Sequence, residues 1–474
     1  MAVFQNNLLA GAAAQSSTTP VHTIDQSIRF NPADSAYMEK TFSGAGNKKQ
    51  FTISLWLKRS LLGSRQDIWS FNQDVPLTFM ADDTLRPFLF GNVTLQTNRV
   101  FRDPSAWYHI VLTVDSTNQI STDRIRMYIN GQRETSFSTT VYPSLNADAS
   151  IWTAGTDLRL FRLVGGTNYH GGYAAEIHYL DGYSYGPEYF GETTSNGLWI
   201  PKEYSGSYGT NGFKIDGRDS SDLGDDESGQ GNDFTTSGLA AHDQVADSPT
   251  NNFATFNSVY ADVTGFTDVT YKNGNLQADA TSSQFDHTVS TYNLPKSGKW
   301  YFEHYLGGRY TGFGICIVGQ EGTISSGYSF GTLSTSQGFG FQDNVVYNGN
   351  SATVTFGGQS SLGDILNCAF DVDNNKVFLG INGTYYAADN GDDGNPSAGT
   401  NPTVTTSFSL STNDIILGFY FSTADGTSFV NFGQEGTFGG NKTAGGNSDA
   451  NGVGNFFNTV PTNYLALCSK NLGS

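Results

Sequence analysis

The stretch 111–132, "VLTVDSTNQISTDRIRMYINGQ", decides the fold class of this chain. Two runs that alternate apolar and polar residues flank a polar turn, and the pair Asn130-Gly131 follows the second run. A period of two is typical of strands. Asn followed by Gly tolerates best the two positive φ angles of a tight hairpin turn. The stretch therefore predicts an antiparallel meander.

The chain repeats this phrase about 250 residues later, at 367–386, as "NCAFDVDNNKVFLGINGTYY". Here Asn382-Gly383 takes the place of the first Asn-Gly pair. Alternating runs also occur on either side of each copy, for example "FTISLWLKRS" (51–60) and "IILGFYFST" (415–423). The sequence thus predicts two all-β domains that share one hairpin.

Composition supports this prediction and excludes several classes of protein. The 474 residues are too many for one ordinary core, and 56 Gly, 34 Phe and 24 Tyr favour strands joined by tight turns. A net charge of −19 would repel a phosphate backbone, so we expect no nucleic-acid partner. No run is long and apolar enough for a membrane span. Cys316 and Cys368 lie in strand-like runs and are predicted to be buried free thiols.

Parts of each domain resemble known families. The strings "WYHIVLTVD", "RIRMYINGQ" and "GYAAEIHYLDG" with "YFGE" resemble the laminin-G/concanavalin A-like lectin family. "GKWYFEHYL", "TGFGI" and "LGDILNCAFDVDNNKVFLGINGTYY" resemble the SPRY family. Both resemblances imply an antiparallel β-sandwich of jelly-roll type.

The expected organisation has five parts, in tandem along the chain. They are an N-terminal arm or anchor (1–22), a laminin-G/concanavalin-like domain (23–200), an acidic connecting segment packed on the domains (201–264), a SPRY-like domain (265–436) and a Gly- and Asn-rich tail (437–474).

The arrangement as a whole resembles structural proteins of tailed bacteriophages. The strings that carry this likeness are "NNLLAGAAA", "SIRFNPADSAYMEKTFSGAGNKKQFTISLWLKR", "LWIPKEYSGSYGTNGF", "SGQGNDF" and "DSPTNNFATFN". The resemblance implies a virion protein made in the host cytoplasm, joined to other virion proteins through its arm. It also implies a homo-oligomer, which we expect to be a trimer.

Catalytic patterns give little support to an enzyme. "AEIHYLD" places Glu176, His178 and Asp181 where some concanavalin-like glycosidases have Glu-x-Asp-x-x-Glu, but the middle Asp is His and the last Glu is Asp. We interpret it as the closing strand of the lectin-like domain, with Glu176 and His178 on one face. No catalytic residue and no cofactor is expected.

A structural calcium ion is left open at the acidic loop "GDDESGQGND" (224–233), which is otherwise a solvated loop. "DVDNNK" (371–376) begins like a calcium-binding loop, but Lys376 replaces the required Gly, so we interpret it as a hairpin turn.

Aromatic residues in Gly-rich loops are the candidate ligand-binding residues. Sugars are bound by rings that stack on their apolar faces, and loops at the rim of a sandwich are free to vary. The candidates in "TNYHGGY" and "DGYSYG" are Tyr169, His170, Tyr173, Tyr183 and Tyr185. The alternative is that these side chains fill loops against the sheet or face a neighbouring subunit. We therefore expect attachment to host-surface glycans, with a capsid decoration or tail adaptor, and a glycan depolymerase, as the alternatives.

Overall fold

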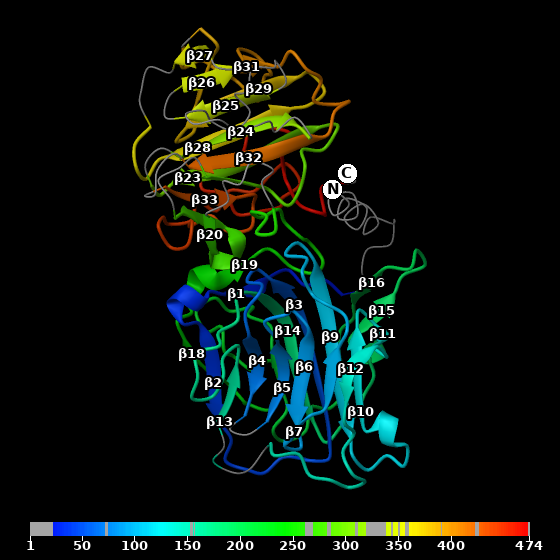
Figure 1. Ribbon diagram of the computed structural model, residues 1–474. Coiled ribbons are helices and arrows are strands. Elements are labelled where there is room, and N and C mark those ends of the chain that lie inside the picture. The colour runs from blue at the N-terminus through cyan, green and yellow to red at the C-terminus, as the bar shows by residue number, and fades with distance from the viewer. Residues whose placement is uncertain are drawn as a thin grey trace. The chain divides into compact units, whose positions relative to one another are not determined.

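The computed structural model divides the chain into two compact units, one up to Asn251 and one from Asn252 onward. We call them the N-terminal and the C-terminal unit (Figure 1). The residues described are 22–71, 74–151, 155, 157–260, 269–281, 286–308, 311–318, 338–342, 345–348, 351–355, 360–389, 391–421 and 426–472. The predicted arm, 1–22, lies outside this description except for His22.

The N-terminal unit is a sandwich of two antiparallel sheets. The eight-stranded sheet has the order β11 (Gln132–Arg133), β10 (Ile125–Ile129), β9 (Trp107–Asp115), β3 (Gln50–Arg59), β14 (Gly172–Asp181), β1 (Ser27–Phe30) and β19 (Gln244–Val245), with β17 (Phe213–Ile215) also paired to β14. The seven-stranded sheet has the order β18 (Thr235–Ser237), β2 (Tyr37–Thr41), β13 (Asp157–Leu160), β4 (Gln66–Ser70), β5 (Val75–Phe79), β6 (Leu85–Leu89) and β7 (Asn92–Val93).

Short elements complete this unit. Two ribbons pair β8 (Leu95–Thr97) with β12 (Phe137–Thr140) and β15 (Gly191–Thr193) with β16 (Trp199–Pro201). The 3₁₀ turns are η1 (Pro32–Asp34), η2 (Ser121–Asp123), η3 (Pro187–Tyr189) and η4 (Ala241–Asp243).

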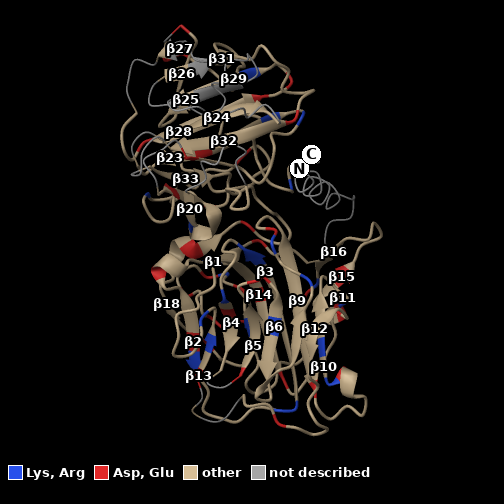
Figure 2. Cartoon of the chain, viewed as in Figure 1, with Lys and Arg blue, Asp and Glu red and all other residues tan. Residues whose placement is uncertain are grey.

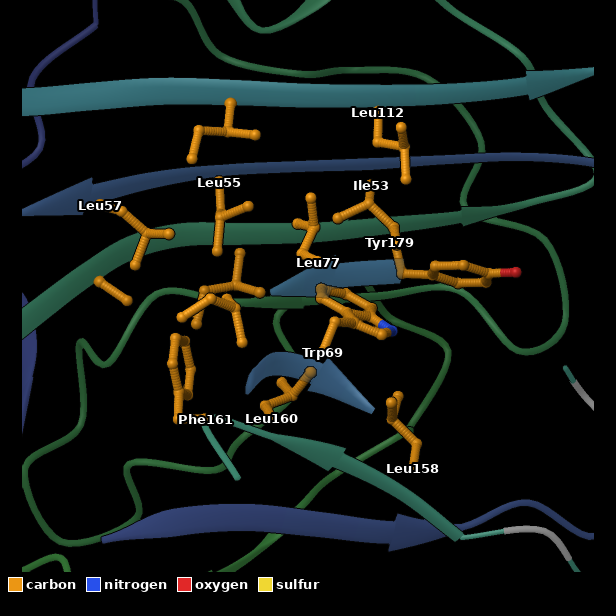
Figure 3. Close-up of a cluster of buried hydrophobic side chains, with 14 of the residues drawn as sticks. Ile53, Leu55, Leu57, Trp69, Leu77, Leu112, Leu158, Leu160, Phe161 and Tyr179 are labelled. Atoms are coloured by element: carbon orange, nitrogen blue, oxygen red, sulfur yellow. The ribbon is translucent and has the colours of Figure 1, made fainter. Parts of the chain in front are cut away.

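The core of the N-terminal unit lies between its two sheets. Ile53, Leu55 and Leu57 of β3 point into it and are fully buried, as is Trp69 of the facing sheet (Figure 3). This confirms the alternation read from "FTISLWLKRS". The other face of β3 is buried too, because segments from outside the sheets cover it.

The C-terminal unit is also a sandwich of two sheets. The nine-stranded sheet has the order β20 (Val269–Lys272), β21 (Gln277–Ala280), β33 (Thr427–Asn431), β23 (Lys299–Leu306), β28 (Ile365–Asp371), β29 (Lys376–Ile381) and β30 (Thr384–Tyr386), with β31 (Val404–Thr405) on β29 and β34 (Leu465–Ala466) on β23. The six-stranded sheet has the order β22 (Asp286–Val289), β32 (Ile415–Phe421), β24 (Thr311–Ile317), β25 (Gly338–Gln342), β26 (Val345–Asn348) and β27 (Ser351–Thr355). One 3₁₀ turn, η5 (Asn273–Asn275), precedes β21.

The repeated phrase forms the same hairpin in both units. Ile129 pairs with Gln132 around Asn130-Gly131, whose φ angles are 49° and 76°. Ile381 pairs with Thr384 around Asn382-Gly383, with φ angles of 51° and 87°. The two Asn side chains accept equivalent backbone hydrogen bonds. The Oδ1 of Asn130 accepts the N–H of His109 (2.7 Å), and that of Asn382 accepts the N–H of Ile365 (3.0 Å). The predicted hairpins are confirmed.

The predicted connecting segment, 201–264, is shared between the two units, because the division falls after Asn251. Phe234 belongs to the core of the N-terminal unit and Phe256 to that of the C-terminal unit. The tail 437–474 packs on the C-terminal unit. Phe438 and Phe456 are buried, and β34 pairs with β23 in parallel.

Cys316, Cys368 and Cys468 are all free and buried, which confirms the prediction for the first two. Figure 2 shows basic residues interspersed with acidic ones in both units. Within the described ranges, no helix has the length and apolar character needed to cross a bilayer.

Candidate functional site

The loop that follows β14 is fixed to the outer face of the eight-stranded sheet. The Thr52 hydroxyl of β3 donates to the Tyr183 carbonyl (2.8 Å) and accepts the N–H of Tyr185 (2.9 Å). The Thr113 hydroxyl of β9 donates to the Tyr185 carbonyl (2.6 Å). Two neighbouring strands thus hold this loop in one conformation, so its side chains are pre-organised.

Three tyrosines of this loop form a stack. The rings of Tyr183 and Tyr185 lie 5.7 Å apart at 26°, and those of Tyr185 and Tyr189 lie 4.2 Å apart at 12°. The first two side chains are half-buried, whereas Tyr189, at one end of the stack, is 43% exposed. We call these three residues the tyrosine platform. It brings together two of the predicted residues and adds Tyr189.

Tyr189 was missing from the predicted set, although the sequence held a signal for it. Pro187 begins η3 two residues earlier, and a Pro at this position favours such a turn. The turn carries Tyr189 back onto Tyr185. The spacing of Tyr183, Tyr185 and Tyr189 around one Pro-initiated turn could have indicated a shared surface.

Tyr169 lies in a different aromatic group. Its ring is 6.4 Å from that of Tyr37 in β2, and the Arg162 guanidinium lies over both rings, at 4.7 Å from Tyr37 and 5.1 Å from Tyr169. All three side chains are half-buried. Tyr37 belongs to the seven-stranded sheet, so this group is separate from the tyrosine platform.

The structure corrects the prediction for His170 and Tyr173, which are both fully buried. His170 Nδ1 lies 3.0 Å from Gln66 Oε1, and burial lowers the pKa of His170 to about 3. Tyr173 pairs with Lys58 inside the sheet, and the Lys58 ammonium lies over its ring. What the sequence presented as one rim loop leads directly into the central strand β14, and both side chains are buried where that strand begins.

A buried charged cluster lies further along β14, at a β-bulge. The register with β3 shifts between Ala175 and His178, and Glu176 takes a φ of 43°. Glu176 is 5% exposed and its carboxylate faces three cationic or imidazole groups. These are His22 Nε2 at 2.8 Å, Lys214 Nζ at 3.4 Å and His178 Nε2 at 3.5 Å. The last contact confirms that Glu176 and His178 share one face.

The protonation states of this cluster follow from its contacts. Desolvation opposes ionisation of Glu176, but the hydrogen bonds with His178 and His22 prevail and hold its pKa far below the usual range. The hydrogen bond to Glu176 raises the pKa of His22, whereas burial lowers that of His178. A carboxylate held this firmly as an anion is a poor general acid.

Asp181 has a separate role at the end of the same strand. Its carboxylate accepts the backbone N–H groups of Asn47 (2.6 Å) and Asn211 (3.2 Å). It therefore fixes two loops. Glu176 and Asp181 therefore have different hydrogen-bond partners and hold the fold together at different points.

His109 links the segment that contains Trp199 to the eight-stranded sheet. The Trp199 indole N–H donates to His109 Nδ1 (3.0 Å), and His109 Nε2 lies 2.9 Å from the Ser54 hydroxyl. Burial is the main cause that lowers the pKa of His109 to about 3, so the ring is neutral. Its Nδ1 acts as the acceptor, which assigns the remaining proton to Nε2.

The two stretches considered for cations are explained by hydrogen bonds. Asp371 pairs with Lys376 across a tight turn, which confirms the predicted hairpin. In the acidic loop, the Asp226 carboxylate accepts the N–H groups of Lys214 (2.9 Å) and Asn232 (2.7 Å). In the part of the chain that the structure describes, no group of three or more His, Cys, Asp or Glu side chains could hold a metal ion.

The fold is all-β and concanavalin-like. Residues 33–176 match the family described as the concanavalin A-like lectin/glucanases superfamily. This part of the chain therefore has a fold found in carbohydrate-binding proteins. No curated protein matches the chain.

The solved structures that match parts of the chain include a SPRY domain, a candidate carbohydrate-binding protein and a pentraxin. The SPRY domain of human HERC1 is 15% identical, with 34% of this chain and 91% of that one covered and a TM-score of 0.24. A candidate carbohydrate-binding protein from Bacteroides ovatus is 16% identical, with coverage of 45% and 58% and a TM-score of 0.31. A heptameric SAP-like pentraxin from Limulus polyphemus is 17% identical, with coverage of 35% and 80% and a TM-score of 0.26.

Proposed function

We propose that this chain is a carbohydrate-binding adhesin that holds glycans on the tyrosine platform of its N-terminal unit. The observation that carries the proposal is the stack of Tyr183, Tyr185 and Tyr189, whose terminal ring is 43% exposed on a loop fixed by Thr52 and Thr113. The match of residues 33–176 to a lectin superfamily supports it.

The chemistry of such a platform suits sugars. A pyranose ring has one face lined by C–H groups, which packs on a flat aromatic ring, while its hydroxyls stay at the edge and reach water or polar groups. Tyrosine offers a large apolar area and a phenolic OH at low cost in side-chain entropy. Because the backbone beneath the rings is already hydrogen-bonded to two strands, little ordering is needed when a glycan binds.

The setting we propose is the surface of a bacteriophage particle. The resemblance of the strings in 6–14, 27–59 and 198–257 to phage structural proteins supports this setting. The arm 1–22 would join the chain to other virion proteins, and a homotrimer would present three platforms to polysaccharide on the host. Weak single sites then give firm attachment through multivalency.

A glycan array with the full chain tests the binding site. We expect bacterial polysaccharides to be retained, and Tyr185→Ala and Tyr189→Ala to weaken binding about three- to tenfold, the range for one aromatic contact. Tyr169→Ala is the matched control, because it removes a half-buried tyrosine from the separate group with Tyr37 and Arg162. Loss of binding in Tyr169→Ala alone would refute the platform.

Two further measurements separate the alternatives. New reducing ends in the bound polysaccharide would identify a depolymerase. Particles that lack 23–474 and still adsorb normally to host cells would show that the chain has no part in adhesion, as expected of a capsid decoration or tail adaptor.

A further inference from the structure

A second concave site lies at the free edge of the eight-stranded sheet. A cavity of about 280 Å³ opens there between β10, the chain after β11, and β12. Its apolar lining includes Leu95, Ile125 and Met127, which belong to the core, and the half-buried rings of Phe137 and Tyr142. Thr122, Thr135 and Thr140 surround it with hydroxyl groups and are exposed.

The cavity exists because the chain leaves the sheet early. After the Asn130-Gly131 turn, the returning strand pairs with β10 only as far as Glu134, whose N–H donates to the Met127 carbonyl (2.8 Å). The Glu134 carboxylate is held by Arg99 Nε at 2.8 Å. The chain then crosses to β8, where Phe137 pairs with Thr97. The first half of β10 is left without a neighbour on this side.

The register shows which backbone groups face the gap. Arg124 accepts a hydrogen bond from Asp115 and Asn130 donates one to His109, so the even-numbered residues of β10 direct their backbone groups toward β9. The odd-numbered residues direct theirs toward the gap. Within the residues described, the N–H and C=O of Ile125 and the N–H of Met127 have no hydrogen-bond partner.

Such groups point to a ligand that can pair with them. Ile125 is 1% exposed and Met127 is fully buried, and buried backbone groups are seldom left unpaired in folded proteins. A complementary ligand would carry an acceptor for the Met127 N–H and a donor for the Ile125 carbonyl, next to a small apolar group that enters the floor of the cavity.

We propose that this cavity binds the acetamido group of an N-acetylated sugar. The acetyl methyl would contact the apolar floor, the acetamido carbonyl would accept the Met127 N–H, and a neighbouring hydroxyl of the sugar would donate to the Ile125 carbonyl. The threonine hydroxyls of the rim are placed to meet hydroxyls of the same sugar ring. This inference rests on the proposed carbohydrate-binding function and specifies the kind of sugar recognised.

An extended peptide would also present a donor and an acceptor to this edge, from two successive amides, but the site favours a sugar. Only the short stretch from Ile125 to Met127 is open, because η2 precedes it and β11 follows. A strand added to a sheet edge needs a longer row of open backbone groups, since strands are commonly about five to six residues long. The volume of the cavity lies just below the usual range for small-molecule sites, about 300–1,000 Å³, and so fits a single ring substituent.

Saturation-transfer NMR on the full chain tests the proposal with four sugars. N-acetylglucosamine and N-acetylgalactosamine should bind, with the strongest transfer at the acetyl methyl. Glucose and galactose, which lack the acetyl methyl and the amide carbonyl that would accept the Met127 N–H, should bind about tenfold more weakly or not at all. Equal binding by sugars with and without the acetamido group would overturn the proposal, and so would tighter binding of N-acetyl-alanine-methylamide, a peptide mimic.

Two substitutions locate the site. Thr140→Trp places a large ring over the cavity from an exposed position and should abolish the acetyl signal. Ser138→Trp is the matched control, because it makes the same change at an exposed position of β12 that does not line the cavity. Unchanged binding in Thr140→Trp would overturn the proposal.

A third variant separates the two binding sites. An acetyl signal that survives Tyr189→Ala and is lost in Thr140→Trp supports the cavity even if the platform binds nothing. Binding of N-acetylated sugars that is lost in Tyr189→Ala and kept in Thr140→Trp overturns the cavity and leaves the proposed function standing.

Discussion

Replacing Gly131, Gly191 and Gly383 by alanine, one at a time, tests how the repeated hairpin is built into each unit. Gly131 and Gly383 occupy the same turn position with φ angles of 76° and 87°. Their surroundings differ. A Cβ at Gly383 would meet only Asn458 Oδ1, at 3.4 Å, whereas a Cβ at Gly131 would lie 2.5 Å from Cζ3 of Trp199. Gly191 lacks the positive φ, but its Cβ would lie 2.5 Å from Cε2 of the same ring.

The expected magnitudes follow from these contacts. Alanine at a left-handed position costs about 1–2 kcal/mol, part of which is offset by lower entropy of the unfolded chain, so Gly383→Ala should lose about 1 kcal/mol. Overpacking adds about 1–3 kcal/mol. The Trp199 ring cannot retreat, since Gly191 approaches it as well and its indole N–H bonds to His109. Breaking that bond would leave a buried acceptor unpaired, at about 1–3 kcal/mol. The sum of these contributions is a loss of about 2–6 kcal/mol for Gly191→Ala and of about 3–7 kcal/mol for Gly131→Ala.

Urea unfolding followed by tryptophan fluorescence measures these changes. Five of the six tryptophans, all but Trp300, precede residue 252, so their emission reports mainly on the N-terminal unit. Gly383→Ala is read from the Trp300 component and from circular dichroism. The reasoning is refuted if Gly131→Ala costs no more than Gly383→Ala, or if Gly191→Ala is neutral, because either result would mean that the Trp199 ring moves freely.

Three further predictions concern the His22–Glu176 pair, the Glu303 carboxylate and the cysteine thiols. The pKa of His22 is raised in the folded chain, so the His22–Glu176 pair stabilises the fold fully below the unfolded pKa of about 6.5. This stabilisation is lost as the pH rises through the folded pKa. Thermal melts from about pH 6 to about pH 8 should show the decline in stability, and His22→Gln should remove this pH dependence. Glu303→Gln should lower the free energy of unfolding in urea by about 2 kcal/mol. The two carboxylate oxygens accept the N–H groups of Phe457 (2.9 Å) and Asn458 (2.7 Å), whereas the amide of Gln has one oxygen and can replace only one of these acceptors. A loss below about 0.5 kcal/mol would contradict this role of Glu303. The three buried thiols should react with a thiol reagent only after unfolding, and fast labelling of the native chain would contradict their burial.

The structural features that could be predicted from the sequence are those that depend on residues close by in the chain. Asn130-Gly131 and Asn382-Gly383 reverse the chain by their own backbone preferences, and the alternation in 51–60 identifies the core face of β3 without knowledge of any partner. These local features do not depend on where the rest of the chain packs. These features predicted two all-β domains that share one hairpin, whereas the sandwich architecture was implied by the family resemblances.

The burial of the other face of β3 could not be predicted in this way. Lys58 alternates outward and appears solvent-exposed in the sequence, yet it is fully buried and its ammonium lies 2.7 Å from Asp247. A partner 189 residues away leaves no local signal. The error at Tyr173 has the same origin, because this residue is covered along with Lys58.

Whether a candidate ligand-binding residue is exposed depends on the element that carries it. Tyr183 and Tyr185 follow the end of β14 and stay partly exposed, whereas Tyr173 lies just inside its start. The sequence marks both places with Gly-rich loops. A Gly pair such as Gly171-Gly172 can begin a central strand as readily as it can form a rim loop. Only the pairing of Gly172 with Arg59 distinguishes the two.

Both units close the outer face of their larger sheet by a similar device, and this closure restricts where a ligand can bind. In the N-terminal unit, Trp199 packs over the hairpin at Gly131 and bonds to His109. In the C-terminal unit, the tail packs Phe456 on Tyr301 at 5.1 Å and donates two backbone N–H groups to Glu303. An open sheet face could have received a long polysaccharide along its strands. With that face covered, a glycan that binds on this side of the sheet would have to contact the covering loops or a free strand edge. The tyrosine platform is a surface of the first kind and the cavity beside β10 is one of the second kind, so the two proposed sites follow from one architectural cause.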